Sequence, residues 1–229
     1  MTHPKLEKLI STEIDFDIKA SFAKAWELYK SQALLHLTFM ILLFSIQGLF
    51  VIYLPNYIAL YSLLLAPPLY TGFFLVANKS SHGQPVRYMD FFGGFGYWFL
   101  MMSIWLVAQI LIVLGLFALV IPGIYLAVSY MFAVLFGIFG GFDFWTSLEY
   151  SRKLVLRNWW KFFQFFVILV VMNLIGAAFV LIHPATAILF IVAICISLPM
   201  TFLVIYVVFE DLTMEALSTD EKESESTHA

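Results

Sequence analysis

Three amide side chains lie near the middle of long uncharged segments of this 229-residue chain: Gln47, Gln109 and Asn173. If helices place these amides at one height, they could line a common polar path through a membrane. The same amides could instead hydrogen-bond between neighbouring helices, an interaction that contributes about 0.6 kcal/mol on average. We favour bonding between helices, because single amides are usual in helical membrane proteins.

Three prolines interrupt the apolar segments: Pro67, Pro68 and Pro199. Each lacks a backbone N–H and is expected to kink its helix. In transporters, a break of this kind can open a binding site. In closely packed proteins, neighbouring helices satisfy the carbonyl groups that the break frees. Both interpretations stay open, and the prolines are the best indication of any cavity.

A group of basic residues precedes the fifth apolar segment, next to two tryptophans. Basic side chains at a membrane surface attract anionic lipid head groups, with about 1 kcal/mol for each. We therefore predict a patch that binds lipid head groups, formed by Arg152, Lys153, Arg157 and Lys161.

No pattern typical of an enzyme accompanies these residues. The apolar segments hold no carboxylate pair, no His-Glu-x-x-His zinc motif and no Gly-x-Ser-x-Gly nucleophile turn. A single cysteine, Cys195, excludes a disulfide within the chain and a cluster of thiolate ligands. The net charge of -3 does not suggest a nucleic-acid partner. We expect a protein that is not an enzyme and has no cofactor, no metal and no nucleic-acid partner.

The elements that must position these residues are membrane spans. The chain is 62% hydrophobic and 12% charged, with a mean hydropathy of +0.94, which is outside the range of soluble domains. A hydrocarbon layer about 30 Å thick needs roughly 20 apolar residues in a helix. We predict an all-α polytopic membrane protein with six transmembrane helices in three hairpins. The six uncharged segments are Leu34 to Leu54, Tyr57 to Ala77, Trp98 to Val120, Ile124 to Phe142, Phe162 to Ile182 and Ala185 to Phe209.

Charge is confined to one side of the predicted spans. The turns within the hairpins, at 55–56, 121–123 and 183–184, carry none, whereas all 12 Lys and Arg lie before, between or after the hairpins. The positive-inside rule makes that side the cytoplasm, so both termini are expected there. The tyrosines at the opposite interface would be Tyr53, Tyr57 and Tyr125.

The charge pattern divides the chain into three regions. Residues 1–32 form a cytoplasmic segment with an interfacial amphipathic helix, 33–209 form the six-helix transmembrane domain, and 210–229 form an acidic cytoplasmic tail that we expect to be disordered. The glycine-rich segment 92–96 is interpreted as a flexible interfacial turn. The apolar face of the amphipathic helix would carry Ile18, Phe22, Trp26 and Tyr29.

The odd-numbered spans share a pattern that indicates an internal repeat. Near its outer end, each of these spans contains a short segment that begins with glycine and leads to a proline. The prolines, at 55, 122 and 184, recur at intervals of 67 and 62 residues. Apolar helices also resemble one another by composition alone, and proline is common at helix starts. Both explanations stay open.

Several short motifs resemble those of a broad family of uncharacterised bacterial six-helix integral membrane proteins, similar to the membrane domain fused to some glycerophosphodiester phosphodiesterases. The motifs are 121–125 (Ile-Pro-Gly-Ile-Tyr), 129–130 (Ser-Tyr), 151–154 (Ser-Arg-Lys-Leu) and 158–160 (Asn-Trp-Trp). The chain departs from the family at 146–148, where Thr-Ser-Leu replaces Glu-Ala-Leu. The resemblance implies a bacterial inner (plasma) membrane location and supplies no reaction.

Two functional hypotheses follow. The first is a non-enzymatic multi-pass inner-membrane protein that binds membrane lipids or other membrane proteins as an accessory or organising component. The alternative is a transporter or flippase-like carrier of an apolar or lipid substrate. A continuous cavity lined by Gln47, Gln109 and Asn173 would favour the carrier, whereas amides that bond one another or face lipid would count against it.

The basic patch generates a testable prediction. Replacing Arg152, Lys153 and Arg157 together by Gln should reduce the anionic phospholipid that copurifies with the protein, because each lost contact removes about 1 kcal/mol of attraction. The difference should shrink as salt is raised, since salt screens exposed charges. Lipid analysis of protein purified at low and high salt measures both effects, and unchanged lipid content at low salt would contradict the prediction.

Overall fold

The computed structural model describes the backbone of residues 15–182 and 187–227 and the side chains of 15–175 and 190–214. The chain is 89% helical, and its described part contains no strand. Five helices are long and apolar enough to cross a membrane, or six when the bent pair Phe144–Leu156 and Trp159–Ile175 counts as one span. The predicted fold class, an all-α polytopic membrane protein, is confirmed.

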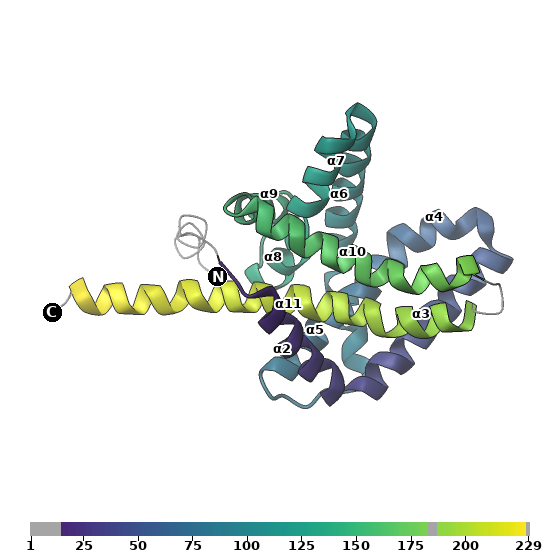
Figure 1. Ribbon diagram of the computed structural model, residues 1–229, viewed down its shortest axis with the longest axis horizontal. Coiled ribbons are helices and arrows are strands. Elements are labelled where there is room, and N and C mark those ends of the chain that lie inside the picture. The colour runs from purple at the N-terminus through teal and green to yellow at the C-terminus, as the bar shows by residue number, and fades with distance from the viewer. Residues whose placement is uncertain (1–14, 183–186, 228–229) are drawn as a thin grey trace.

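The helices form hairpins that do not all run in one direction. Figure 1 shows α10 and α11 extending side by side in the same direction as α3, while α6 and α7 stand out from them at a steep angle. The elements are α2 (Ile18–Ser31), α3 (Ala33–Tyr53), the 3-10 helix η1 (Pro55–Tyr57), α4 (Ile58–Leu60), the π-helix η2 (Tyr61–Leu65), α5 (Ala66–Ser81), the 3-10 helix η3 (Tyr88–Tyr97), α6 (Trp98–Ala118), α7 (Val120–Ser129), α8 (Ala133–Gly140), α9 (Phe144–Leu156), α10 (Trp159–Ile182) and α11 (Ala187–Thr227).

Glycine allows α5 and η3 to lie in backbone contact. A Cβ atom at Gly72 would lie 1.9 Å from the carbonyl oxygen of Phe91, and one at Gly94 would lie 2.0 Å from that of Pro68. Segment 92–96 is therefore not the flexible turn that the sequence suggested. It belongs to a regular 3-10 helix, because its glycines let the backbone pack against α5.

The second span is interrupted where Pro67 and Pro68 enter α5. Without an N–H on Pro68, the carbonyl of Leu64, four residues earlier, loses its helical donor. The chain forms the π-helix η2 at this point, and the indole N–H of Trp98 donates to the Leu64 oxygen at 2.6 Å. A neighbouring helix thus satisfies the freed carbonyl. At Pro199, by contrast, α11 continues without a break.

The fourth predicted span consists of two helices, α7 and α8, separated at residues 130–132. The fully buried Ser151 of α9 bonds to both sides of this break. Its Oγ donates to the Ser129 carbonyl at 2.7 Å and accepts from the Phe132 N–H at 3.1 Å. One side chain therefore bonds to the backbone carbonyl and N–H groups that would bond to other backbone groups in a continuous helix.

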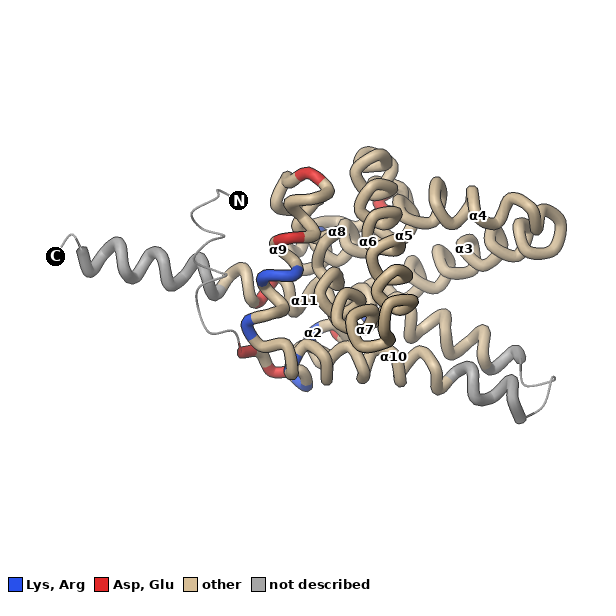
Figure 2. The backbone as a smooth tube through the Cα atoms, turned by 90° about the horizontal axis from the view of Figure 1, so that it is seen from above, with Lys and Arg blue, Asp and Glu red and all other residues tan. Residues whose placement is uncertain are grey.

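Charged side chains gather in one part of the molecule. Figure 2 shows Lys, Arg, Asp and Glu near α2, α9 and the adjoining part of α11, whereas the hairpin ends of α3–α4 and α6–α7 carry none. Tyr125 departs from its predicted place at the opposite interface. Its ring stacks on Trp159 with centroids 6.4 Å apart, and its hydroxyl lies within hydrogen-bonding reach of Arg152. That prediction is wrong because the short helix α7 leans against α9.

The amphipathic helix α2 packs along α11. Its N-terminus is capped by Asp17, whose Oδ1 accepts from the Lys19 and Ala20 N–H groups at 2.8 and 3.2 Å. The protein-facing side carries the buried Ser21, Ala25 and Tyr29, so it only partly matches the predicted apolar face.

The C-terminal segment differs from its predicted disorder. α11 runs to Thr227, so residues 210–227 are helical. Glu and Lys favour helix, and the long preceding helix removes the cost of nucleation. His183 and Pro184, which form the third turn of the predicted repeat, lie outside the described residues, and the repeat stays a prediction.

Replacing Gly72 by Ala should lower the free energy of unfolding by roughly 1–3 kcal/mol, because the new methyl group meets the Phe91 backbone. Helix propensity alone would make the Ala variant more stable by about 1 kcal/mol. A loss of stability would therefore point to the close backbone contact. Thermal unfolding in detergent measures it. Gly48→Ala is the matched control, since a Cβ there has nothing within 4 Å. Equal unfolding temperatures for the two variants would contradict the close packing.

Candidate functional site

A cavity of about 300 Å³ lies between α6, the α7–α8 segment and the α10–α11 pair, with one residue from α5. None of the described residues that line it carries a charge. Its volume is at the lower end of the range for small-molecule sites, roughly 300–1,000 Å³. The lining residues are Phe74, Ile104, Trp105, Ala108, Gln109, Ile112, Ala127, Tyr130, Met131, Val134, Phe166, Leu169, Val170, Asn173, Thr201, Phe202 and Ile205.

Asn173 lines the cavity and also joins α10 to α11. Its Nδ2 donates to the Leu169 carbonyl and to Thr201 Oγ1, each at 2.8 Å, and its Oδ1 accepts from the Ser197 hydroxyl at 3.0 Å. The Thr201 hydroxyl in turn donates to the Ser197 carbonyl at 2.9 Å. This amide therefore bonds between helices, which is the interpretation that the sequence favoured.

Gln109 also lines the cavity, from the middle of α6. No hydrogen bond to its side chain occurs within the described part of the chain. Gln47 is half-buried in α3 and is not among the lining residues. The structure thus brings two of the three predicted amides together at this cavity and leaves out the third. Proline was a poor guide to the cavity, since Pro67, Pro68 and Pro199 do not line it.

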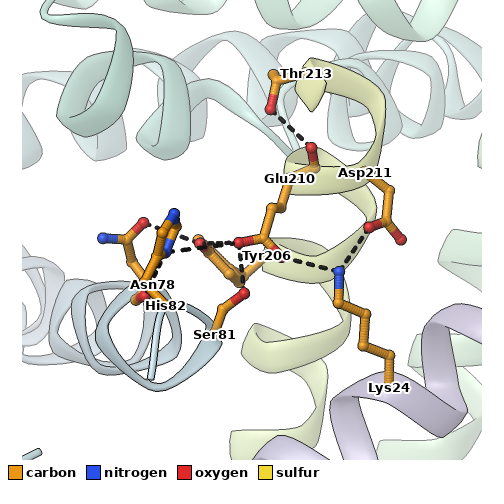
Figure 3. A network of polar contacts seen from close by, with 8 residues as sticks. All are labelled: Lys24, Asn78, Ser81, His82, Tyr206, Glu210, Asp211 and Thr213. Atoms are coloured by element: carbon orange, nitrogen blue, oxygen red, sulfur yellow. Dashed lines mark hydrogen bonds and ion pairs between the residues drawn. The ribbon is translucent and has the colours of Figure 1, made fainter. Parts of the chain in front are cut away.

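A buried carboxylate joins three helices at the charged end of the molecule. Glu210 of α11 is only 7% exposed. Its Oε1 accepts from the Ser81 hydroxyl at 2.6 Å and lies 2.7 Å from the Tyr206 hydroxyl, while its Oε2 lies 3.0 Å from Lys24 Nζ. Figure 3 shows these side chains converging from α2, α5 and α11. A carboxylate can be buried here because each oxygen has a partner.

The Lys24 ammonium lies between two carboxylates. Its Nζ is 2.7 Å from Asp211 Oδ1 and 3.0 Å from Glu210 Oε2. Partial burial lowers the pKa of Lys24, but the hydrogen bonds to Asp211 and Glu210 outweigh it, so the pKa is raised from its ordinary value. Lys24 therefore stays charged and holds α2 against α11.

The end of α5 completes the network. The Asn78 Oδ1 lies 2.9 Å from the Tyr206 hydroxyl, and the His82 Nδ1 lies 2.9 Å from the Asn78 carbonyl oxygen. His82 Nδ1 is also 3.9 Å from Glu210 Oε1. The arrangement fixes the ends of three helices through hydrogen bonds and ion pairs.

This network is not among the sites predicted from the sequence. Glu210 is the first charged residue after the uncharged run 162–209, and Tyr206 precedes it by one helical turn. That spacing could have marked a carboxylate held beside a phenol. Nothing in the local sequence shows that Lys24 and Ser81, 186 and 129 residues away, would meet it.

Two carboxylates pair with members of the predicted lipid head-group patch and offset about half of its four positive charges. Arg152 binds Glu149 through two hydrogen bonds of 2.9 and 2.8 Å, and Lys153 Nζ lies 3.6 Å from the same carboxylate. Lys161 pairs with Asp15. Arg157 is exposed and has no acidic partner among the described residues. Because Arg152 and Lys153 share one carboxylate, the patch keeps a net positive charge among the described residues.

Comparisons of the chain with protein-family models, with curated proteins and with solved structures found no match. The site is therefore interpreted from its own geometry.

Replacing Glu210 by Ala should lower the free energy of unfolding by roughly 1–3 kcal/mol, because Ser81 and Tyr206 lose a buried acceptor. Urea or thermal unfolding of the purified protein in detergent measures the change. Glu27→Ala provides the control, since Glu27 also pairs with a lysine, Lys30, but at an exposed position. Exposed pairs of this kind are worth about 0–1 kcal/mol. A Glu210 effect no larger than that of Glu27 would show that the network adds no stability.

Proposed function

We propose that this protein is a non-enzymatic, multi-pass membrane protein that binds membrane lipids as an accessory or organising component. The cavity between α6 and the α10–α11 pair carries the proposal. Its walls are almost entirely apolar, and no acidic or basic side chain lines it among the described residues. Such a site suits a lipid chain better than a charged metabolite, whose burial would leave its charge unpaired.

The surroundings of the cavity support entry from the side. Next to the cavity, α6 exposes Ile110, Val113 and Leu114 by 49%, 43% and 59%. Exposed side chains of this type are expected to face lipid in a membrane-embedded helix. A lipid chain could therefore pass from the surrounding membrane into the cavity without crossing water.

We further propose a bacterial inner membrane with both termini in the cytoplasm. The one-sided distribution of Lys and Arg supports that orientation. The resemblance to the six-helix family supports this location. We also propose that the chain is related to that family. Other membrane proteins are further proposed partners, which the apolar outer faces of α6 and α7 would contact.

The carrier alternative retains one supporting observation, namely that Gln109 and Asn173 share the cavity. A carrier also needs a path across the membrane. Gln47 lies away from the cavity, and Asn173 is engaged in bonds between helices. Lipid binding without transport is therefore the better-supported function.

Filling the cavity tests the proposal. Ala108→Phe adds a large ring to the cavity wall, and we expect lipid bound per protein to fall about tenfold or more, equivalent to about 1.4 kcal/mol. Native mass spectrometry of protein purified gently from membranes measures the bound lipid. Ala118→Phe makes the same change at an exposed position of α6 outside the cavity. Equal lipid content in the two variants would overturn the proposal.

A further inference from the structure

Two hydrogen-bond donors on one face of α6 line the cavity. Trp105 and Gln109 are one helical turn apart, and both are lining residues. Neither side chain has a hydrogen-bond partner among the residues that the structure describes. An indole N–H is a donor only, and a primary amide has two donor hydrogens. Gln109 is exposed at the cavity and Trp105 is half-buried, so in the hydrocarbon of a membrane neither donor would meet water. A donor without a partner in an apolar environment costs several kcal/mol, roughly 2–7 for an amide.

Besides Tyr130, the other polar side chains on the lining are Asn173 and Thr201, and they do not meet this need. Both N–H bonds of Asn173 are used, one for Leu169 and one for Thr201, and the Thr201 hydroxyl donates to Ser197. These groups belong to α10 and α11 and bond among themselves. The donors of α6 are thus left for something that occupies the cavity.

The lining also restricts the charge of an occupant. No Lys, Arg or His is among the lining residues. A carboxylate or phosphate group at this place would have no cation to pair with, and burying it would be unfavourable. An uncharged acceptor, by contrast, gains hydrogen bonds from the indole and the amide without such a cost.

We infer that the cavity binds an uncharged, carbonyl-bearing lipid, with Trp105 and Gln109 donating hydrogen bonds to its carbonyl oxygen. The inference rests on the proposed function and adds the class of ligand. The hydrocarbon chain lies against the apolar walls, and the carbonyl group lies at the α6 face. Gln109 and Trp105 thereby select ester-like lipids over plain hydrocarbons and over fatty-acid anions.

The probe is dioleoylglycerol, compared with oleate at alkaline pH and with octadecane. Binding to the full chain in detergent is measured by native mass spectrometry or by thermal shift. We expect the unmodified protein to bind dioleoylglycerol tightest of the three. Gln109→Leu keeps the shape of the side chain and removes the donor. It should weaken dioleoylglycerol binding about three- to tenfold, the range expected for one hydrogen bond, and leave octadecane binding unchanged.

Gln47→Leu is the matched control, because it removes an amide from a span without touching the cavity, and it should leave all three affinities unchanged. Trp105→Phe is a second variant, and like Gln109→Leu it should lower the affinity for dioleoylglycerol. The inference would be overturned if the protein bound oleate as tightly as it binds dioleoylglycerol. It would also be overturned if Gln109→Leu and Gln47→Leu bound dioleoylglycerol equally well.

The outcomes separate this inference from the proposed function. If Ala108→Phe blocks dioleoylglycerol while Gln109→Leu does not weaken it, the cavity binds lipid but the donor assignment is wrong. If Ala108→Phe leaves both lipid content and dioleoylglycerol binding unchanged, the proposed function and the inference fail together.

Discussion

The cost of placing an ionised side chain in hydrocarbon governs how this chain is arranged. The helices α3, α6, α7 and α8 carry no charged residue, so α3, α6 and α7 can expose apolar side chains to lipid while α8 is mostly buried inside the protein. The charges of the described residues lie on α2, α9, η3, the adjoining ends of α5, α10 and α11, and the segments that precede or connect them. Glu210, the one buried carboxylate among the described residues, lies where these ends meet and is paired with Lys24. The ends of three helices are joined there because a charge at that place requires a partner.

Several polar groups within the apolar helices are satisfied by neighbouring elements. The Trp98 indole bonds to the carbonyl that Pro68 frees, and Ser151 bonds to both sides of the break between α7 and α8. Asn173 does the same between α10 and α11. Gln47 and Gln109, by contrast, have no hydrogen-bond partner among the described residues, and only Gln109 lines the cavity. Four buried polar atoms of described residues also lack a hydrogen-bond partner: His36 Nδ1, the Tyr61 hydroxyl, Ser129 Oγ and Trp159 Nε1. Gln109 differs from them because it lines the cavity, where a ligand could accept its hydrogen bonds.

The fold class could be predicted from the sequence because uncharged runs of about 20 residues have few alternatives in lipid. The site could be predicted only in part. Gln47 and Gln109 are the same residue type at similar depth, and only the packing of their helices decides which one reaches a cavity. The position of Tyr125 likewise depends on how α7 packs against α9, which the local sequence does not show. The local sequence around Gly72 shows a glycine but not the backbone that it meets.

The bond between Lys24 and Glu210 has a consequence for the order of biosynthesis. These residues are separated by 186 positions, so the partner of the first described helix is made almost last. At roughly 5–20 residues per second, α2 waits about ten to forty seconds after its own synthesis before Glu210 leaves the ribosome. During that interval its protein-facing side has no α11 to pack against. Until α11 is made, another apolar surface such as the membrane interface has to cover the buried side of α2, because amphipathic helices bind there through their apolar face.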